Sequence, residues 1–225
     1  MNLQACLFDL DGVIIDTAKY HYLAWRELAA ELGFDFTEED NERLKGVSRM
    51  QSLEILLEVG GITFDNGKKL QLAAQKNARY LQLVLQMPRE DVLPGAVEFV
   101  LGCKKSGLKA GIASASKNAP AILNHMNMSS LFDAVIDGNM ISHSKPDPEV
   151  FQAGAKALSV SPLTCVVFED AAAGVDAAHN AGMFCVGIGS DTNLPLADMV
   201  VPGLFSLTIE DVLREYAAHM SVTEQ

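Results

Sequence analysis

Near the start of the chain, residues 5–12 read Ala-Cys-Leu-Phe-Asp-Leu-Asp-Gly. The apolar run from Ala5 to Phe8 leads directly into two carboxylates spaced i, i+2. A short, wholly apolar run is typical of a buried strand in a parallel sheet. Side chains two residues apart in an extended chain point the same way, so we expect Asp9 and Asp11 to share one small volume at the strand's carboxyl end. Gly12 would then let the chain turn sharply.

Two neighbouring carboxylates need an explanation. At about 4 Å they repel by roughly 4 kcal/mol at an effective dielectric near 20. A bound cation, a proton on one of them or a splayed geometry would relieve the repulsion. The stretch could also be a strand that ends in an ordinary polar turn, since Asp is a common turn former. A calcium-binding loop that begins at Asp9 is excluded, because it would need Gly in place of Ile14 and Glu in place of Tyr20.

The composition limits the possible partners. The net charge of −12 over 225 residues argues against a nucleic-acid partner and against an anionic membrane surface. We find no signal peptide and no membrane span. The four cysteines form no CxxC pair, and Cys6, Cys165 and Cys185 lie in apolar runs, which suits a reducing compartment. We therefore expect a cytoplasmic, monomeric protein with a full hydrophobic core, given 49% apolar residues.

Residues 16–91 read as an all-helical insertion without a strand signal. We expect Thr17 to cap the first of its helices and Gly33 to end it. His21, Trp25 and Leu28 fall on one face of that helix. Ser48 opens another helix that stops at Gly60, and a long helix runs from about residue 65 to 86. The predicted domains are therefore an α/β core of residues 1–15 and 92–225, and a helical cap domain of residues 16–91.

After residue 91 the pattern changes to strands that alternate with helices, which predicts a doubly wound, Rossmann-like parallel sheet. Strands are expected at 110–113, 134–136, 165–168, 184–188 and 199–201. Ligands of such folds bind beyond the carboxyl ends of the strands, near the switch point. Asp9, Ser114 and Asp170 all fall at such ends. The insertion leaves the core after the first strand, so we expect it to act as a lid.

The motif Phe8-Asp9-Leu10-Asp11-Gly12-Val13, followed by Asp16 and Thr17, resembles the first motif of the haloacid dehalogenase superfamily of phosphotransferases. Three further motifs follow in the right order. The resemblance implies that Asp9 is a nucleophile that becomes phosphorylated. It implies that Asp11 is the general acid and base.

Two later motifs supply polar groups at the predicted phosphate. Ser114 follows an apolar strand and precedes a helix, a position that suits an anion, although taken alone it would more often be an ordinary loop or capping serine. The resemblance implies that Ser114 holds the phosphoryl group in transfer. Lys145 lies in His143-Ser144-Lys145-Pro146-Asp147-Pro148 and would by itself be taken for a solvated charge. By resemblance it neutralises the phosphate and Asp9.

Glu169 and Asp170 end a predicted strand as a second acidic pair. The resemblance implies a Mg²⁺ ion held by Asp9, the backbone carbonyl of Asp11 and Asp170, with Glu169 orienting the water ligands. Alternatively, Asp170 could simply cap the helix that follows it.

The insertion narrows the resemblance to the β-phosphoglucomutase family within that superfamily. The matching positions are Thr17, His21, Trp25, the loop Leu44-Lys45-Gly46-Val47-Ser48-Arg49, Ser52, Lys76, Asn77 and, in the core, Ser114-Ala115-Ser116-Lys117-Asn118. In that family the residue matching His21 contacts the acid/base, whereas on its own it would be read as a core histidine. The resemblance implies that Arg49 binds a second phosphate together with Ser116, Lys117 and Asn118. The remaining substrate-binding positions would be Thr17, His21, Trp25, Lys45, Gly46, Val47, Ser52, Lys76 and Ala115.

Taken together, the resemblance implies a Mg²⁺-dependent phosphomutase that acts on a small phosphorylated sugar. It would interconvert β-D-glucose 1-phosphate and β-D-glucose 6-phosphate through β-glucose 1,6-bisphosphate. The nearest alternative is a sugar-phosphate phosphatase, in which water accepts the phosphoryl group. A regulator without turnover would be expected to lack Asp9 or Asp11, and both are present.

Overall fold

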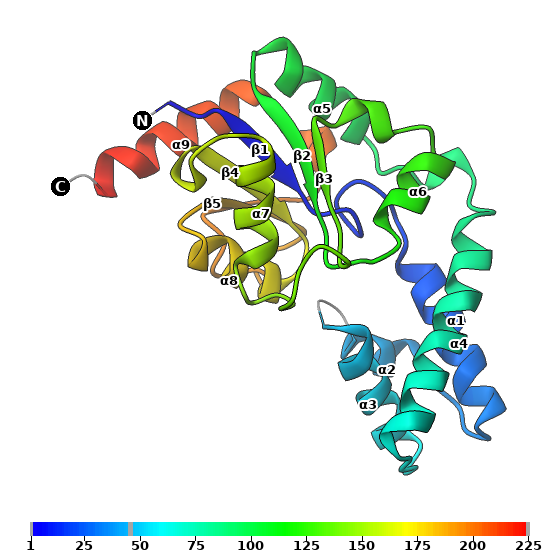
Figure 1. Cartoon of the computed structure of the whole chain (residues 1–225). Helices are drawn as coiled ribbons and strands as arrows, with labels where there is room; N and C mark the ends of the chain where they lie inside the picture. The colour runs from blue at the N-terminus through cyan, green and yellow to red at the C-terminus, as the bar shows by residue number, and fades with distance from the viewer. Residues whose placement is uncertain (1, 45–46, 224–225) are drawn as a thin grey trace. The chain divides into compact units, whose positions relative to one another are not determined.

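The structure is a computed structural model that describes residues 2–44 and 47–223. The chain forms two compact units, one of Met1–Asp16 with Arg89–Gln225 and the other of Thr17–Pro88. The predicted cap domain began one residue earlier and ended three residues later than this second unit. Each unit is described by itself below, with element labels as in Figure 1.

The first unit is built on a parallel sheet of six strands. Its order is β3-β2-β1-β4-β5-β6, so that β1 lies between β2 and β4. This order is that of a doubly wound sheet, which confirms the predicted fold class. The strands are β1 Ala5–Phe8, β2 Lys109–Ala113, β3 Ala134–Ile136, β4 Cys165–Glu169, β5 Phe184–Ile188 and β6 Met199–Val201.

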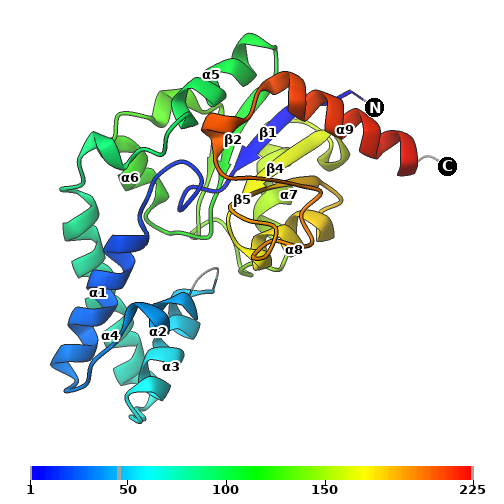
Figure 2. The same ribbon diagram turned by 180° about the vertical axis from the view of Figure 1, so that it is seen from behind.

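Helices cover both faces of this sheet, as Figures 1 and 2 show for α7 and α8 on one face and α5 and α9 on the other. The helices are α5 Ala96–Lys105, α6 Ala119–His125, α7 Glu149–Ala157, α8 Ala172–Asn180 and α9 Ile209–Thr223. Short 3₁₀ turns lie at Arg89–Asp91, Ser129–Leu131, Pro162–Thr164 and Leu204–Ser206.

The central strands are apolar because both of their faces are buried. Every residue of β1 is buried, and Phe8 stacks on Phe168 of β4 with ring centroids 4.6 Å apart. Cys6, Cys165 and Cys185 are free, buried thiols, as their apolar surroundings in the sequence predicted. The sheet therefore forms a rigid base whose strand ends can hold functional groups in fixed positions.

The second unit is helical and has a core of its own. Its helices are α1 Ala18–Glu31, α2 Glu38–Glu42, α3 Arg49–Val59 and α4 Asn66–Val84. Trp25 and Leu28 of α1 pack in one buried cluster with Leu53 and Leu56 of α3 and Leu72 of α4. In the part of the chain that the structure describes, no helix is long and apolar enough to cross a membrane.

Polar caps fix several helix ends. Ser48 and Gln51 form a capping box at the start of α3, as do Thr37 and Asp40 for α2. The prediction for Thr17 was wrong in one respect: it is the residue before α1, but its side chain makes no capping hydrogen bond. Its backbone is in the helical region rather than the extended region that capping side chains need.

Candidate active site

The predicted acidic residues meet at the switch point of the sheet. β1 and β4 are neighbours with Phe8 paired to Phe168, so Asp9 and Glu169 follow these two residues side by side. Asp9 donates its backbone N–H to the Phe168 carbonyl at 3.0 Å. The strand order of a doubly wound sheet reverses at this point. Such a switch point leaves a crevice at the carboxyl ends of the strands. Residues from distant parts of the sequence thus come together.

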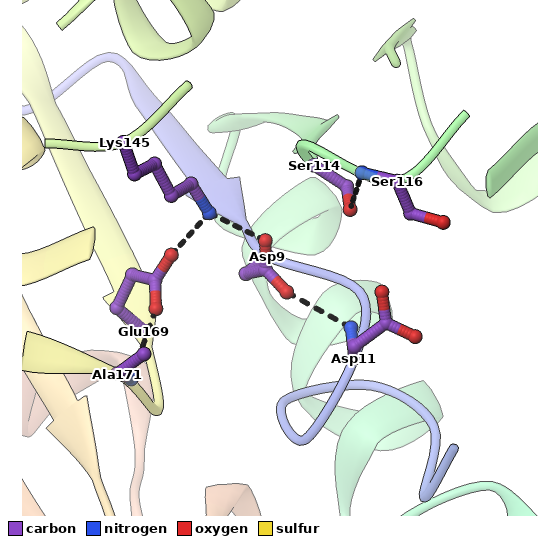
Figure 3. A network of polar contacts seen from close by, with 7 residues as sticks. All are labelled: Asp9, Asp11, Ser114, Ser116, Lys145, Glu169 and Ala171. Atoms are coloured by element: carbon purple, nitrogen blue, oxygen red, sulfur yellow. Dashed lines mark hydrogen bonds and ion pairs between the residues drawn. The ribbon is translucent and has the colours of Figure 1, made fainter. Parts of the chain in front are cut away.

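Asp9 is the centre of the polar network in Figure 3. Lys145 Nζ donates to Asp9 Oδ1 at 2.5 Å and also pairs with Glu169 Oε1. The backbone N–H of Asp11 donates to Asp9 Oδ2 at 2.9 Å. Both carboxylate oxygens of Asp9 are therefore held, and the carboxylate has a fixed orientation.

Asp11 lies differently from the simple alternation of a strand. β1 ends at Phe8, and Asp11 forms an isolated bridge with Ile15 after a bend. Figure 3 shows the Asp11 side chain beside Asp9, whose carboxylate accepts the backbone N–H of Asp11. The chain bends at Leu10, so the alternation of a strand does not extend to Asp11. The expectation that the two carboxylates share one small volume stays a prediction.

Charge and burial shift the proton affinities of this network. Burial by itself would lower the pKa of Lys145, but the carboxylates of Asp9 and Glu169 outweigh it, and the pKa is raised. The ammonium group therefore stays charged. Burial raises the pKa of Asp170 well above its usual value, and the nearby charges of Glu169 and Asp9 raise it further. The protein thus does not fully compensate the negative charge of the ionised Asp170 carboxylate.

A cation at Asp170 would supply that compensation. A Cβ placed on Gly12 would collide with the Asp170 carboxylate, so this carboxylate lies against the backbone that follows Asp11. Asp9, the Asp11 carbonyl and Asp170 are oxygen donors of the kind Mg²⁺ prefers. The donor set therefore fits the ion that the sequence predicted.

The alternative role of Asp170 as a helix cap finds no support. The residue before α8 is Ala171, which has no side-chain cap. Glu169 instead accepts the Ala171 N–H through Oε2 at 3.1 Å, while its other oxygen pairs with Lys145. Both oxygens of Glu169 are therefore in use within the protein, which agrees with a supporting position beside a metal rather than with direct ligation.

Another group of potential metal ligands lies on the loop before α7. Among the residues that the structure describes, His143, Asp147 and Glu149 place one ligand atom each within 4.8 Å of one another. Glu149 Oε2 accepts the backbone N–H groups of Ser142 and His143, and Asp147 Oδ1 accepts that of Glu149. Since these carboxylates already bind the backbone, the group is explained by the loop's own structure, which also contains the cis Lys145–Pro146 bond.

The loop after β2 is held by hydrogen bonds between its own residues. Ser114 is buried and follows β2, the strand next to β1. Its hydroxyl oxygen accepts the Ser116 N–H at 3.1 Å, and the Ser116 hydroxyl oxygen accepts the Asn118 N–H at 3.3 Å. Each hydroxyl is thereby left with its hydrogen to donate. Asn118 is buried before α6, whereas Ala115 and Lys117 are exposed.

The helical unit brings three of its predicted residues together. Lys76 is only 2% exposed, and its ammonium group lies 2.8 Å from His21 Nδ1 and 4.6 Å from the centre of the Trp25 ring. Burial lowers the pKa of His21 well below its usual value, and the positive charges of Lys76 and Arg49 lower it further. A neutral imidazole that accepts from Lys76 at Nδ1 carries its proton on Nε2.

The other predicted residues of this unit lie close to α1 or α3. Thr17 and Ser52 are buried, and Val47 and Arg49 are half-buried. Arg49 is the first residue of α3, a place where the helix dipole disfavours a cation. Lys45 and Gly46 lie outside the described residues.

One residue beside this cluster was missed. Tyr80 is fully buried, its ring centroid lies 4.0 Å from that of His21, and Lys76 Nζ lies 4.8 Å from the ring centre. The signal was present in the sequence, because Tyr80 follows Lys76 by four residues and so shares its helix face.

Comparisons with known proteins show similarity along most of the chain. Residues 3–182 match the family of haloacid dehalogenase-like hydrolases. The chain is 42% identical over 216 residues to the β-phosphoglucomutase of Bacillus subtilis strain 168, covering 95% of this chain and 96% of that protein. It is 33% identical over 187 residues to a phosphorylated carbohydrates phosphatase of Thermotoga maritima, covering 80% and 82%. The crystal structure of a β-phosphoglucomutase from Clostridium difficile superimposes with a TM-score of 0.92 at 42% identity, covering 97% and 99%.

Proposed function

The chain belongs to the haloacid dehalogenase-like hydrolase family, and from this premise we propose that it is a phosphomutase that interconverts β-D-glucose 1-phosphate and β-D-glucose 6-phosphate. The observation that carries the proposal is its similarity to a β-phosphoglucomutase at 42% identity over 95% of the chain. The Asp9 network supports it, because a carboxylate held at both oxygens suits nucleophilic attack.

We propose that the cycle begins with the phosphorylated form of Asp9. The 6-hydroxyl of β-glucose 1-phosphate attacks the aspartyl phosphate and gives its proton to the carboxylate of Asp11. The product is β-glucose 1,6-bisphosphate, and Asp9 is a free carboxylate again. Asp9 then attacks the phosphorus on C1, and Asp11 returns its proton to the departing sugar oxygen. Glucose 6-phosphate leaves, and Asp9 is phosphorylated again.

Other residues stabilise the charge that moves between sugar and enzyme. Lys145, which stays protonated beside Asp9, would compensate the negative charge of the transferring group. The hydroxyl of Ser114 would donate to one of its oxygens. Enzymes of this family generally use Mg²⁺. Held by Asp9, the Asp11 carbonyl and Asp170, the ion would screen the repulsion between phosphate and carboxylates.

Two phosphate sites are required, because the bisphosphate presents its two phosphates in turn to Asp9. We propose that Arg49 of the helical unit and Ser116, Lys117 and Asn118 of the α/β unit bind the phosphate that does not react. The neutral His21, with its proton on Nε2, would donate a hydrogen bond, and we propose that Thr17, Trp25, Ser52 and Lys76 support substrate binding in the same unit. Lys45, Gly46, Val47 and Ala115 would contribute to the substrate site as well.

A sugar-phosphate phosphatase is the second candidate. The relative from Thermotoga maritima favours it, since that protein is a phosphatase of phosphorylated carbohydrates. Both reactions share the phosphorylation of Asp9 and differ only in the acceptor, which is a sugar hydroxyl in the mutase and water in the phosphatase.

A product assay separates the two. The protein is incubated with Mg²⁺, β-glucose 1-phosphate and a trace of β-glucose 1,6-bisphosphate, and glucose 6-phosphate and free phosphate are followed together. We expect glucose 6-phosphate as the main product and a lag without the bisphosphate. Free phosphate as the main product would assign the phosphatase function instead.

A further inference from the structure

The turn after β3 lies directly against the loop that follows β2. The backbone N–H of Gly138 donates to the Ser116 carbonyl at 3.2 Å. The side-chain amide of Asn139 donates through Nδ2 to the Lys117 carbonyl at 3.3 Å. Two successive residues of the turn thus bind two successive carbonyls of the loop. The turn as a whole comprises residues 137–139.

The turn is itself held in place. Asp137 is buried, and its Oδ1 accepts the backbone N–H of Asn139 at 2.6 Å. The Asp137 carbonyl accepts the N–H of Met140 at 3.0 Å. Just before the turn, the Ile136 carbonyl accepts the N–H of Ser114. The shape of the turn is therefore fixed by its own hydrogen bonds and not only by its contacts with the loop.

Gly138 is the point of closest approach. A Cβ on Gly138 would lie well inside van der Waals contact with the Ala115 carbonyl oxygen, and 3.0 Å from both the Ala115 carbonyl carbon and Lys117 Cγ. The nearest atom is backbone, so it cannot rotate away as a side chain could. Gly138 is not among the glycines with positive φ. Its need for glycine comes from the contact with the loop rather than from its own backbone conformation.

The contacts determine which way the loop presents its polar groups. In a planar trans peptide the N–H points opposite to the C=O. With the carbonyl of Ser116 facing the turn, the N–H of Lys117 points away from it. The N–H groups of Ser116 and Asn118 bind the hydroxyl oxygens of Ser114 and Ser116, which leaves the hydrogen of each hydroxyl to be donated elsewhere.

We propose that the turn 137–139 positions residues 116–118 of the loop for the second phosphate, with Gly138 as the positioning residue. The inference rests on the proposed function of that loop. It means that the turn contributes to the affinity for the phosphate that does not react. The turn makes no hydrogen bond or ion pair with Asp9 or Lys145 among those that the structure gives, so its effect should fall on binding rather than on the phosphorylation of Asp9.

The test compares two reactions in four variants. KM and kcat are measured for the conversion of β-glucose 1-phosphate, and the hydrolysis of acetyl phosphate, which has one phosphate only, is measured alongside. Gly138→Ala moves the loop, and Asn139→Ala removes one hydrogen bond at an exposed position where folding is not at risk. Lys117→Ala is the reference for loss of second-phosphate binding. Gly107→Ala is the control, because Gly107 precedes β2 at its other end, has φ +80° and has no neighbour within 4 Å of a Cβ.

We expect Gly138→Ala to raise KM by about tenfold or more, and Asn139→Ala to raise it by a smaller factor, with little change in kcat. Hydrolysis of acetyl phosphate should stay within about twofold of wild type. Gly107→Ala should lower the melting temperature and leave both reactions unchanged, because it strains the backbone away from the loop.

Two results would overturn the inference. If Lys117→Ala raises KM while Gly138→Ala and Asn139→Ala leave it within about twofold, the loop binds the phosphate without help from the turn. If acetyl phosphate hydrolysis falls by the same factor as the mutase reaction, the turn acts on the common chemistry. An unchanged KM in Lys117→Ala would instead contradict the proposed role of the loop, and the inference with it.

Discussion

Two neighbouring groups hold the carboxylate of Asp9 in place. Lys145 binds one carboxylate oxygen and the N–H of Asp11 the other, so the proposed nucleophile has a fixed orientation. The pair with Lys145 also keeps a positive charge where the phosphoryl group would develop negative charge. Such preorganisation explains why these residues are buried although they are polar.

We predict that Asp9→Asn loses about 10⁴-fold or more in kcat, because an amide cannot form the aspartyl phosphate. The variant should fold, since asparagine has the same shape and can still accept from Asp11. Turnover is measured under the conditions of the product assay. Asp16→Asn, at an exposed position after β1, is the control and should keep wild-type turnover. Activity of Asp9→Asn within about tenfold of wild type would place the nucleophile elsewhere.

Asp170 provides a test of the metal site that does not depend on activity. Its pKa is raised well above the usual value by burial and then by Glu169 and Asp9, so its charge is costly in the absence of a cation. We predict that Mg²⁺ at about 100 times its dissociation constant stabilises the wild type by about 2.7 kcal/mol, several degrees in melting temperature. Asp170→Asn should lose this shift, and without Mg²⁺ it should be at least as stable as the wild type.

The sign of the pH effect follows from the same shift. Protons compete with the metal for a carboxylate whose pKa is raised, so the Mg²⁺-dependent shift should shrink as the pH falls. Asp191→Asn, exposed on the loop after β5, is the control and should keep the full shift. An equal Mg²⁺ shift in Asp170→Asn and wild type would contradict the assignment of Asp170 as a ligand.

At the scale of elements, α1 and α4 are coupled through a histidine that is kept neutral. His21 of α1 accepts from Lys76 of α4, and burial first and the charges of Lys76 and Arg49 next lower its pKa well below 6.5. When the pH falls below about 6.5, the unfolded chain binds a proton at this histidine that the folded chain does not. The free energy of unfolding therefore rises with pH in this window. The contribution of His21 to stability is lost on acidification.

We predict that His21→Gln removes part of this pH dependence. Trp25, the one tryptophan of the chain, lies in the core of the helical unit and reports its unfolding by fluorescence. Denaturation curves at about pH 7.5 and about pH 5.5 should show a larger loss of stability for the wild type than for His21→Gln. His125→Gln, in α6, should behave like wild type. Equal pH dependence in wild type and His21→Gln would mean that His21 is charged in the folded state.

The elements also show what the sequence could and could not predict. The strands at 134–136, 184–188 and 199–201 lie where the apolar runs placed them, because buried parallel strands need such runs. The bend after Phe8 was not predictable from alternation, which holds only while the chain stays extended. The pairing of His21 with Lys76 depends on how α1 packs on α4, and sequence spacing within one helix carries no information on that.

Close packing between loops could not be predicted from the sequence either. Gly138 reads as an ordinary turn glycine, and only its contact with Ala115 shows why glycine is needed there. For Glu169 and Asp170, the resemblance implied different roles, but the sequence did not show the contacts that distinguish them. Their environments differ, since Glu169 pairs with Lys145 and the Ala171 N–H, whereas Asp170 lies against the backbone of Gly12.

For the whole molecule, the net charge of −12 makes any binding of a doubly charged phosphate depend on local cations. Both units supply such groups: Lys145 and Lys117 in the α/β unit, and Lys76 and Arg49 in the helical unit. Arg49 stands at the first position of α3, where the helix dipole opposes its charge.

The choice between mutase and phosphatase should depend on the helical unit, because water at about 55 M competes with the sugar hydroxyl for the aspartyl phosphate. If Arg49 binds the phosphate that does not react, it turns remote binding energy into correct placement of the sugar. We predict that Arg49→Ala lowers the mutase rate by about 2–4 kcal/mol in transition-state free energy, roughly 30- to 1000-fold. Hydrolysis needs no second phosphate and should fall much less. The ratio of glucose 6-phosphate to free phosphate should therefore fall in the product assay.

Arg43→Ala is the matched control for this prediction. It removes an arginine of the same unit that is exposed and paired with Glu58 at 3.1 Å, so the change in net charge is the same as in Arg49→Ala. The product ratio of Arg43→Ala should equal that of the wild type, because screened surface charges act weakly at a distance. If Arg49→Ala lowers both products by one factor, Arg49 supports both reactions alike and does not select the acceptor. If Arg43→Ala lowers the ratio as much as Arg49→Ala, the effect comes from net charge rather than from a phosphate contact at Arg49.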